Sequence, residues 1–196
     1  LVVSVVALGI AIERFIFLFF KYNINANAFM AQIQKLVMAG NVDRAIKLCN
    51  AAPSAALPKV VKAGLTRANK GEVQIQNAIE EATLEVIPFV TRRTNALLAL
   101  ANIATLLGLL GTIIGLIEAF AALEDAAPED RQRLLAGGIS LAMNTTAFGL
   151  VVAIPTMVAH LFLSGISKRI VDEIDQHSVK LENLLVAHSK RGGVEG

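Results

Sequence analysis

The sequence predicts an all-α membrane protein with three transmembrane helices and long cytoplasmic helical extensions. Of its 196 residues, 55% are hydrophobic and only 17% are charged, whereas soluble domains carry about a quarter charged residues. The mean hydropathy is +0.60, and two long apolar runs contain no Asp, Glu, Lys or Arg. Because roughly 20 apolar residues in a helix span the hydrocarbon core of a bilayer, each run is long enough to cross.

The first predicted transmembrane helix covers residues 1–21. Its apolar run, residues 1–12, is shorter than a full crossing, and the chain begins with Leu instead of Met. We therefore expect this helix to be N-terminally incomplete, with Glu13 and Arg14 at the membrane interface. A signal-peptide core and a buried soluble helix are the alternatives. The sequence shows neither the basic region nor the small-residue cleavage site that a signal peptide requires.

Residues 22–93 are predicted to form a cytoplasmic helical domain. Turn signals divide this segment at Gly40–Asn41, Pro53, Pro58 and Gly71. Apolar residues recur at helical spacing between these turns, so each helix offers one face for packing. The region around Gly40 predicts a helix-turn-helix. One long helix is expected from residue 72 to about residue 122, with a kink or pause at Pro88.

The second and third transmembrane helices are predicted at residues 94–123 and 134–167, joined by a short loop at residues 124–133. The second helix contains an uncharged run at residues 94–117, and the third is uncharged over its whole length. Because the third run is longer than one crossing requires, we expect it to tilt or to protrude from the bilayer. Residues 168–196 then form a cytoplasmic C-terminal helix and tail.

Positive charge predicts the orientation, because cytoplasmic segments of membrane proteins are rich in Lys and Arg. Residues 13–93 contain eleven Lys and Arg, whereas residues 118–133 contain two against five acids. The tail after residue 167 contains five. These counts place the N-terminus outside, the large segment inside, the short loop outside and the C-terminus inside.

The sequence contains no catalytic or metal-binding pattern, which predicts a protein that is not an enzyme and holds no cofactor. It has neither a P-loop nor an HExxH motif, and its single cysteine, Cys49, is most simply a small core residue. His160, His177 and His188 share no evident face with acidic ligands. His160 suits either a proton relay or, with more support, an interfacial position.

The charged residues argue against two further classes of function. Glu80, Glu81 and Glu85 have the spacing of a solvated helix face, which is favoured over paired-carboxylate catalysis. The net charge is +2 and is spread along the chain, so no nucleic-acid partner is predicted.

Small residues are concentrated in the second transmembrane helix. Gly111 and Gly115 form a small-xxx-small pair, which permits close approach of helix backbones in lipid. Thr105, Gly108, Thr112 and Gly115 lie on one helical stripe. We expect this stripe to line a pore or to pack against another helix.

The third transmembrane helix carries a matching polar centre. Asn144, Thr145 and Thr146 are adjacent, Gly149 continues a face of small residues, and Pro155 frees the carbonyl one turn earlier. The hydroxyls either bond to carbonyls of their own helix and pack the helix pair, or line a wet pathway or a pocket for a partner's ionisable group. Three adjacent polar residues exceed what packing requires, which favours the second interpretation.

Four segments carry a resemblance to a known family. They are LGLLGTIIGLIEAF at residues 107–120, GISLAMNTTAFGLVVAIP at residues 138–155, ALPKVVKAGL at residues 56–65, and the pair Glu13 and Arg14. These segments closely resemble the ExbB/TolQ branch of the MotA/TolQ/ExbB proton-channel family. The resemblance covers essentially the whole chain.

The resemblance implies a proton-driven motor subunit in the inner membrane of a Gram-negative bacterium, with its N-terminus in the periplasm. Five such subunits would form a ring around two copies of a single-span ExbD/TolR-like partner, whose helix carries the proton-binding aspartate. A TonB/TolA-like transducer is a further expected partner. The family's pore threonines match Thr112 and Thr146, which become proton-pathway residues by resemblance, and Thr145 is their neighbour.

One position departs from the family pattern. ExbB-type proteins often carry a glutamate five residues before the threonine that matches Thr146, and this chain has Leu141 there. The difference leaves TolQ-like and gliding-motor relatives open. A membrane scaffold or adaptor without an ion path is the competing class, and a flagellar stator is a nearer alternative. Neither the process that is powered nor the choice between H⁺ and Na⁺ follows from the sequence.

Overall fold

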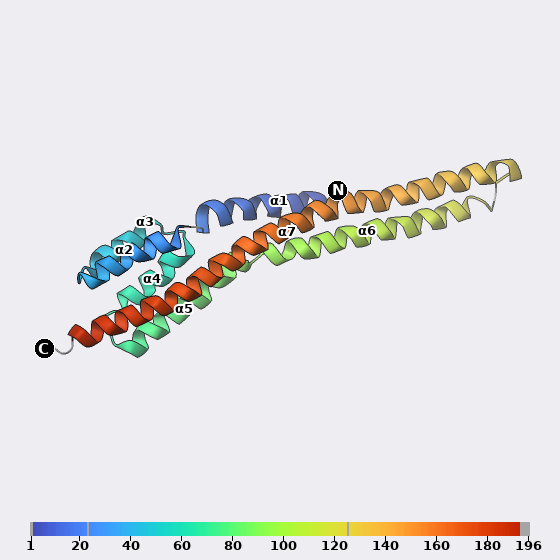
Figure 1. The fold of residues 1–196 in the computed structure, drawn as a ribbon. Coiled ribbons are helices and arrows are strands. Elements are labelled where there is room, and N and C mark those ends of the chain that lie inside the picture. The colour runs from blue at the N-terminus through green and yellow to red at the C-terminus, as the bar shows by residue number, and fades with distance from the viewer. Residues whose placement is uncertain (1, 23, 125, 193–196) are drawn as a thin grey trace. The chain divides into compact units, whose positions relative to one another are not determined.

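The computed structural model describes residues 2–22, 24–124 and 126–192, and within these ranges it contains helices and no strand (Figure 1). The elements in chain order are α1 (Val2–Ile16), the π-helix η1 (Phe17–Tyr22), α2 (Ala26–Met38), α3 (Val42–Ala51), α4 (Ala56–Thr66), α5 (Glu72–Thr91), α6 (Thr94–Ala121) and α7 (Pro128–Gly192). The predicted all-α class is confirmed.

The chain divides into two compact units. The first consists of Leu1–Arg14 and Arg93–Phe162 and is called the membrane unit here. It contains α1, α6 and the N-terminal part of α7. The second unit consists of Phe15–Arg92 and Leu163–Gly196. It contains η1, α2 to α5 and the C-terminal part of α7.

Large apolar side chains point outward over much of the membrane unit. Leu106 and Ile117 are each 63% exposed, and Leu161 is 70% exposed. Such a surface is unfavourable in water and well solvated by lipid chains. Among the described residues, three helical stretches are long and apolar enough to cross a membrane, namely Val2–Phe20, Glu72–Ala121 and Pro128–Ala187. The prediction of a helical membrane protein is therefore confirmed.

The second unit has an apolar core to which several helices contribute one face each. Its buried residues include Met30, Ile33 and Val37 of α2, Val60, Val61 and Leu65 of α4, Ile75 and Ile79 of α5, and Ile174, Leu181 and Leu185 of α7. Gly64 allows a close approach of helices, because a Cβ there would lie 2.8 Å from Cγ1 of Ile79 and 3.1 Å from Cδ2 of Leu181.

The predicted helix-turn-helix around Gly40 is present between α2 and α3. The Asn25 side chain caps the start of α2 by accepting a hydrogen bond of 3.1 Å from the N–H of Ala28. Gly40 has a φ of +72°, a left-handed conformation that glycine adopts without a steric penalty. The N–H of Asn41 then donates to the Leu36 carbonyl, which closes the end of α2.

Cys49 lies in α3 and is 2% exposed. Burial raises the pKa of its thiol to about 11, so the thiol is uncharged at neutral pH. A protonated, buried thiol is a poor nucleophile, which fits the predicted role of a small core residue.

The expected single helix from residue 72 to about residue 122 is interrupted, and the interruption is not at Pro88. Pro88 lies inside α5, where it removes only one N–H from the ladder of hydrogen bonds. The break lies at Arg92 and Arg93, and Arg93 has a φ of 64° in the left-handed region. The two arginines lie between α5 and α6, next to the apolar segment, and are not helical. The turn that they form lets the Arg93 side chain reach Glu13.

Candidate functional site

The candidate site is the contact between α6 and α7 in the membrane unit. Small residues of α6 face small or hydroxylated residues of α7, so the two backbones approach closely. The whole contact is called the seam here. On α6 it consists of Ala104, Gly108, Gly111 and Gly115, and on α7 it consists of Ala142, Thr145, Thr146 and Gly149.

The glycines of the seam have almost no space for a side chain. A Cβ on Gly149 would lie 2.9 Å from both the Ala104 carbonyl oxygen and the Gly108 Cα. A Cβ on Gly111 would lie 2.7 Å from Oγ1 of Thr145, and one on Gly115 would lie 3.0 Å from Cβ of Ala142. Two of these contacts involve backbone atoms, which have little freedom to move aside. Each of these three glycines therefore lies where the neighbouring helix leaves little room for a Cβ.

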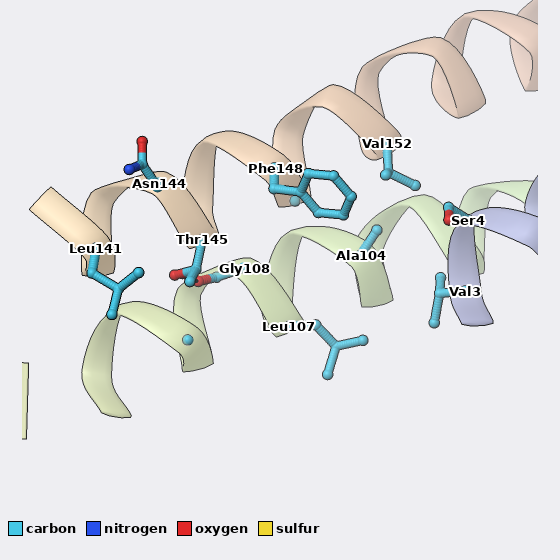
Figure 2. Close-up of a pocket in the computed structure, with 12 residues that line it drawn as sticks. Val3, Ser4, Ala104, Leu107, Gly108, Leu141, Asn144, Thr145, Phe148 and Val152 are labelled. Atoms are coloured by element: carbon cyan, nitrogen blue, oxygen red, sulfur yellow. Dashed lines mark hydrogen bonds between the residues drawn. The ribbon is translucent and has the colours of Figure 1, made fainter. Parts of the chain in front are cut away.

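Two hydroxyls of α7 reach the backbone of α6 at one point. Oγ1 of Thr146 donates a hydrogen bond of 3.2 Å to the Gly108 carbonyl. Oγ1 of Thr145 lies 3.4 Å from the same carbonyl and 2.7 Å from the Ala142 carbonyl in its own helix. Figure 2 shows Thr145 directed from α7 towards Gly108. A hydroxyl that donates in this way keeps its lone pairs to accept a further hydrogen bond.

Three further threonines of the two helices, Thr105, Thr112 and Thr156, bond within their own helix. Oγ1 of Thr112 donates to the Leu109 carbonyl at 2.6 Å, and Oγ1 of Thr105 donates to the Ala101 carbonyl at 3.1 Å. Oγ1 of Thr156 donates to the Val152 carbonyl at 2.7 Å beside Pro155, which stays within α7. Thr112 is half-buried next to the seam, whereas Thr105 is exposed.

A groove of about 400 Å³ runs beside the seam and ends at α1 (Figure 2). Asn144, Phe148 and Leu141 line it from α7, and Leu107 lines it from α6. Asn144 is exposed in this single chain, and Leu141 is 60% exposed. Leu141 thus places an apolar side chain next to the Asn144 amide, at the position where the family resemblance implies that a glutamate is often found.

Sequence reasoning missed a polar cluster at the start of α6. Nη1 of Arg93 lies 2.5 Å from Oε1 and 2.6 Å from Oε2 of Glu13 on α1. Nδ1 of His160 on α7 donates to the Thr94 carbonyl at 2.8 Å, because a carbonyl can only accept. Glu13, Arg93 and His160 therefore tie α1 and α7 to the first turn of α6. The early Glu13 and the doubled arginine were the available sequence signals, but no local rule pairs residues so far apart.

No metal site accompanies the seam. Within the part of the chain that the structure describes, no group of three His, Cys, Asp or Glu residues is placed to hold a metal ion. The His188 side chain lies outside the described part. Glu80, Glu81 and Glu85 are exposed on α5, as expected for a solvated face.

The apolar spans and the seam define a multi-span α-helical membrane protein whose polar groups are concentrated between two helices. Residues 53–176, more than half of the chain, match the model of the MotA/TolQ/ExbB proton channel family. The chain belongs to this family. Its members are channel or motor subunits and not enzymes.

Several curated relatives of this chain carry the ExbB name. The chain is 38% identical over 82 residues to biopolymer transport protein exbB1 of Vibrio cholerae, covering 42% of this chain and 36% of the relative. It is 31% identical over 90 residues to biopolymer transport protein ExbB of Aquifex aeolicus, covering 46% of this chain and 59% of the relative. An ExbB homologue of Methanothermobacter thermautotrophicus is 33% identical over 119 residues, covering 60% of this chain and 40% of the relative. These matches support the ExbB-like branch, and in each of them the alignment spans less than two thirds of the relative's length.

Proposed function

We propose that this chain is an inner-membrane subunit of a motor complex driven by the proton-motive force. Five copies form a ring around an ExbD/TolR-like single-span partner, and proton flow is coupled to mechanical work on the cell envelope or to TonB-type transport. A TonB/TolA-like transducer receives that work. The relatives named as biopolymer transport proteins support this assignment.

The observation that carries the proposal is the placement of the Thr146 hydroxyl. It bonds across the seam to Gly108, within two apolar spans. A hydroxyl fixed in this way can accept a hydrogen bond from a protonated carboxyl group, and it can bond to water beside a carboxylate. Thr112 and Thr145 provide further hydroxyls near this point, so we assign all three to the proton pathway.

The energetics fit a partner aspartate that alternates between two environments. A carboxylate near the bilayer centre costs about 2.5 to 3.5 kcal/mol on insertion scales, and hydroxyls and water lower this cost. A proton that crosses 100 mV gains about 2.3 kcal/mol, which is of the same size. Proton uptake and release can therefore bias the partner helix between positions around the ring. Because Leu141 replaces the family's glutamate, the partner aspartate is the only carboxyl group in this step.

The test replaces Thr146 by Val and by Ser in the complex with its partner. Valine keeps the shape and removes the hydroxyl, whereas serine keeps the hydroxyl. Proton uptake into proteoliposomes, followed with a pH-sensitive dye, should fall at least about tenfold for Thr146→Val, the equivalent of about 1.4 kcal/mol, and should be largely retained for Thr146→Ser. Exposed Lys62→Ala is the control that leaves uptake unchanged. Full uptake by an assembled Thr146→Val complex would disprove the hydroxyl role.

A scaffold or adaptor without an ion path is the second candidate. Its support is that Thr105, Thr112 and Thr145 donate to carbonyls of their own helices, as threonines that only pack a helix pair do. A scaffold would show no partner-dependent proton uptake in the wild-type protein. The same dye measurement therefore separates the two functions.

A further inference from the structure

The second unit contains a polar cleft between α2 and α7. Its volume is about 500 Å³, and Asn27, Met30 and Gln34 line it from α2. His177, Lys180 and Asn183 line it from α7. The outer side chains Asn27, Gln34, Lys180 and Asn183 are exposed, whereas Met30 and His177 are buried. The cleft thus offers amide and ammonium donors around a buried imidazole.

His177 is the unusual member of this cleft. It is 3% exposed, and neither ring nitrogen has a hydrogen-bond partner among the described residues. A buried polar group without a partner is unfavourable by about 1–3 kcal/mol, so a group that enters the cleft and bonds to the ring is favoured. Lys180 and Glu173 are charged groups close enough to act on the ring.

A complementary surface lies on the outer side of α5 in the same unit. Val73, Asn77, Glu80 and Leu84 have spacings of four, three and four residues, which places them on one stripe of the helix. Val73 and Leu84 are each 66% exposed, and Asn77 and Glu80 are exposed between them. Exposed apolar side chains are favoured when another protein removes them from water, and Glu80 adds an acid between the two of them.

We propose that the α5 stripe of one copy occupies the α2–α7 cleft of the next copy, with Glu80 facing Lys180 and His177. The carboxylate pairs with the ammonium group and accepts a hydrogen bond from the imidazole, while Val73 and Leu84 cover Met30 and its surroundings. This contact joins different surfaces of the two copies, and a contact of that kind closes into a ring when the rotation permits it. The inference rests on the ring assembly in the proposed function and assigns its contact outside the membrane spans.

Cross-linking between copies tests the contact directly. One tagged chain carries Glu80→Cys and a second, differently tagged chain carries Lys180→Cys, each with Cys49→Ala. A short bis-maleimide should give cross-linked dimers from cells that express both chains and not from cells that express either one alone. Lys47→Cys, an exposed lysine of α3 outside the cleft, replaces Lys180→Cys in the control and should give at least tenfold less product.

Charge reversal provides a second measurement on rings in lipid nanodiscs. Glu80→Lys and Lys180→Glu should each lower the fraction of assembled ring, and the double variant should recover at least tenfold in the association constant over the single variants. Absence of the mixed cross-link in assembled rings, or absence of recovery, overturns the inference, as does a monomeric wild type. Rings that give the mixed cross-link but transport no protons across the membrane would support the inference. They would contradict only the proposed function.

Discussion

At the scale of single residues, the seam depends on the absence of side chains at its glycines. Gly149→Ala would place a Cβ 2.9 Å from the Ala104 carbonyl oxygen and from the Gly108 Cα, so the two backbones must separate. Overpacking of this kind destabilises by about 1–3 kcal/mol. We expect a lower melting temperature in detergent by circular dichroism and a smaller fraction of assembled ring.

Gly137→Ala is the matched control for this substitution. Gly137 lies in the same helix, and nothing lies within 4 Å of a Cβ built there. Because alanine is a better helix former, the control should be neutral or up to about 1 kcal/mol more stable. If the two variants melt at the same temperature, the close packing at Gly149 does not contribute to stability.

His177 gives the second unit a stability that depends on pH. Burial, followed by the charge of Lys180, lowers the pKa of its imidazole, and Glu173 acts in the opposite direction. The unfolded chain therefore binds a proton at a higher pH than the folded chain does. Stability is full above the unfolded value near 6.5, falls as the pH drops below it, and stops falling once the pH is below the lowered folded pKa.

The melting temperature of the monomeric chain in detergent, in which no second copy occupies the cleft, measures this effect at pH 7.5 and pH 5.5. The wild type should melt at a lower temperature at pH 5.5. His177→Leu should reduce the difference between the two pH values, because leucine does not titrate. The assignment fails if the wild type and the leucine variant lose the same number of degrees on acidification.

The glycines of the seam could be predicted from the sequence, but the bonding of its hydroxyls could not. Small residues at three- and four-residue spacing indicate close helix contact whatever the partner helix is. The choice of Thr146 over Thr112 as the donor across the seam depends on the rotation of α7 against α6. That rotation is set by many packing contacts at once, which no single motif encodes.

At the scale of elements, the junction between α5 and α6 differs most from expectation. Proline at position 88 suggested the break, but a helix tolerates the loss of one N–H when its neighbours remain bonded. The left-handed Arg93 instead separates the helices, and its ion pair with Glu13 of α1 holds the turn. A pair of residues 80 positions apart cannot be inferred from local spacing.

A double-mutant cycle measures this ion pair. We expect Glu13→Gln and Arg93→Gln each to destabilise the protein and the double variant to cost less than their sum. The side chains are 32% and 48% exposed, so solvent screens the pair, and a coupling energy of about 1 kcal/mol at most is expected. Thermal melting in detergent at low and high salt gives the coupling, which should shrink with salt.

Arg92→Gln is the control for the cycle. Arg92 is adjacent to Arg93 and exposed, so its substitution removes the same positive charge from the same region. It should show no coupling to Glu13→Gln. Equal coupling for both arginines would mean that general charge, and not the specific contact, holds α1 at the start of α6.

At the scale of the whole molecule, the sequence predicted the class and the number of candidate spans because apolar composition is a property of long segments. Residues 94–117 and 134–167 carry no charge, and α6 and α7 contain them. The continuity of α7 was not predicted: the sequence suggested a loop over residues 124–133, a span at residues 134–167 and a separate C-terminal helix, whereas one helix runs from Pro128 to Gly192. The contacts between copies could not be predicted, because they depend on surfaces that are brought together only by folding and assembly.

The distribution of Lys and Arg makes a final prediction about orientation. Because residues 13–93 carry eleven basic residues and residues 118–133 only two, the loop between α6 and α7 should lie in the periplasm and the second unit in the cytoplasm. A membrane-impermeant maleimide added to spheroplasts should label Glu129→Cys and should label Lys47→Cys only after the membrane is opened. The native Cys49 stays silent in both cases, since it is 2% exposed and its thiol pKa is about 11. Labelling of Lys47→Cys in sealed spheroplasts would show that the orientation is the opposite of the predicted one. The protons that reach Thr146 would then enter from the other side of the membrane.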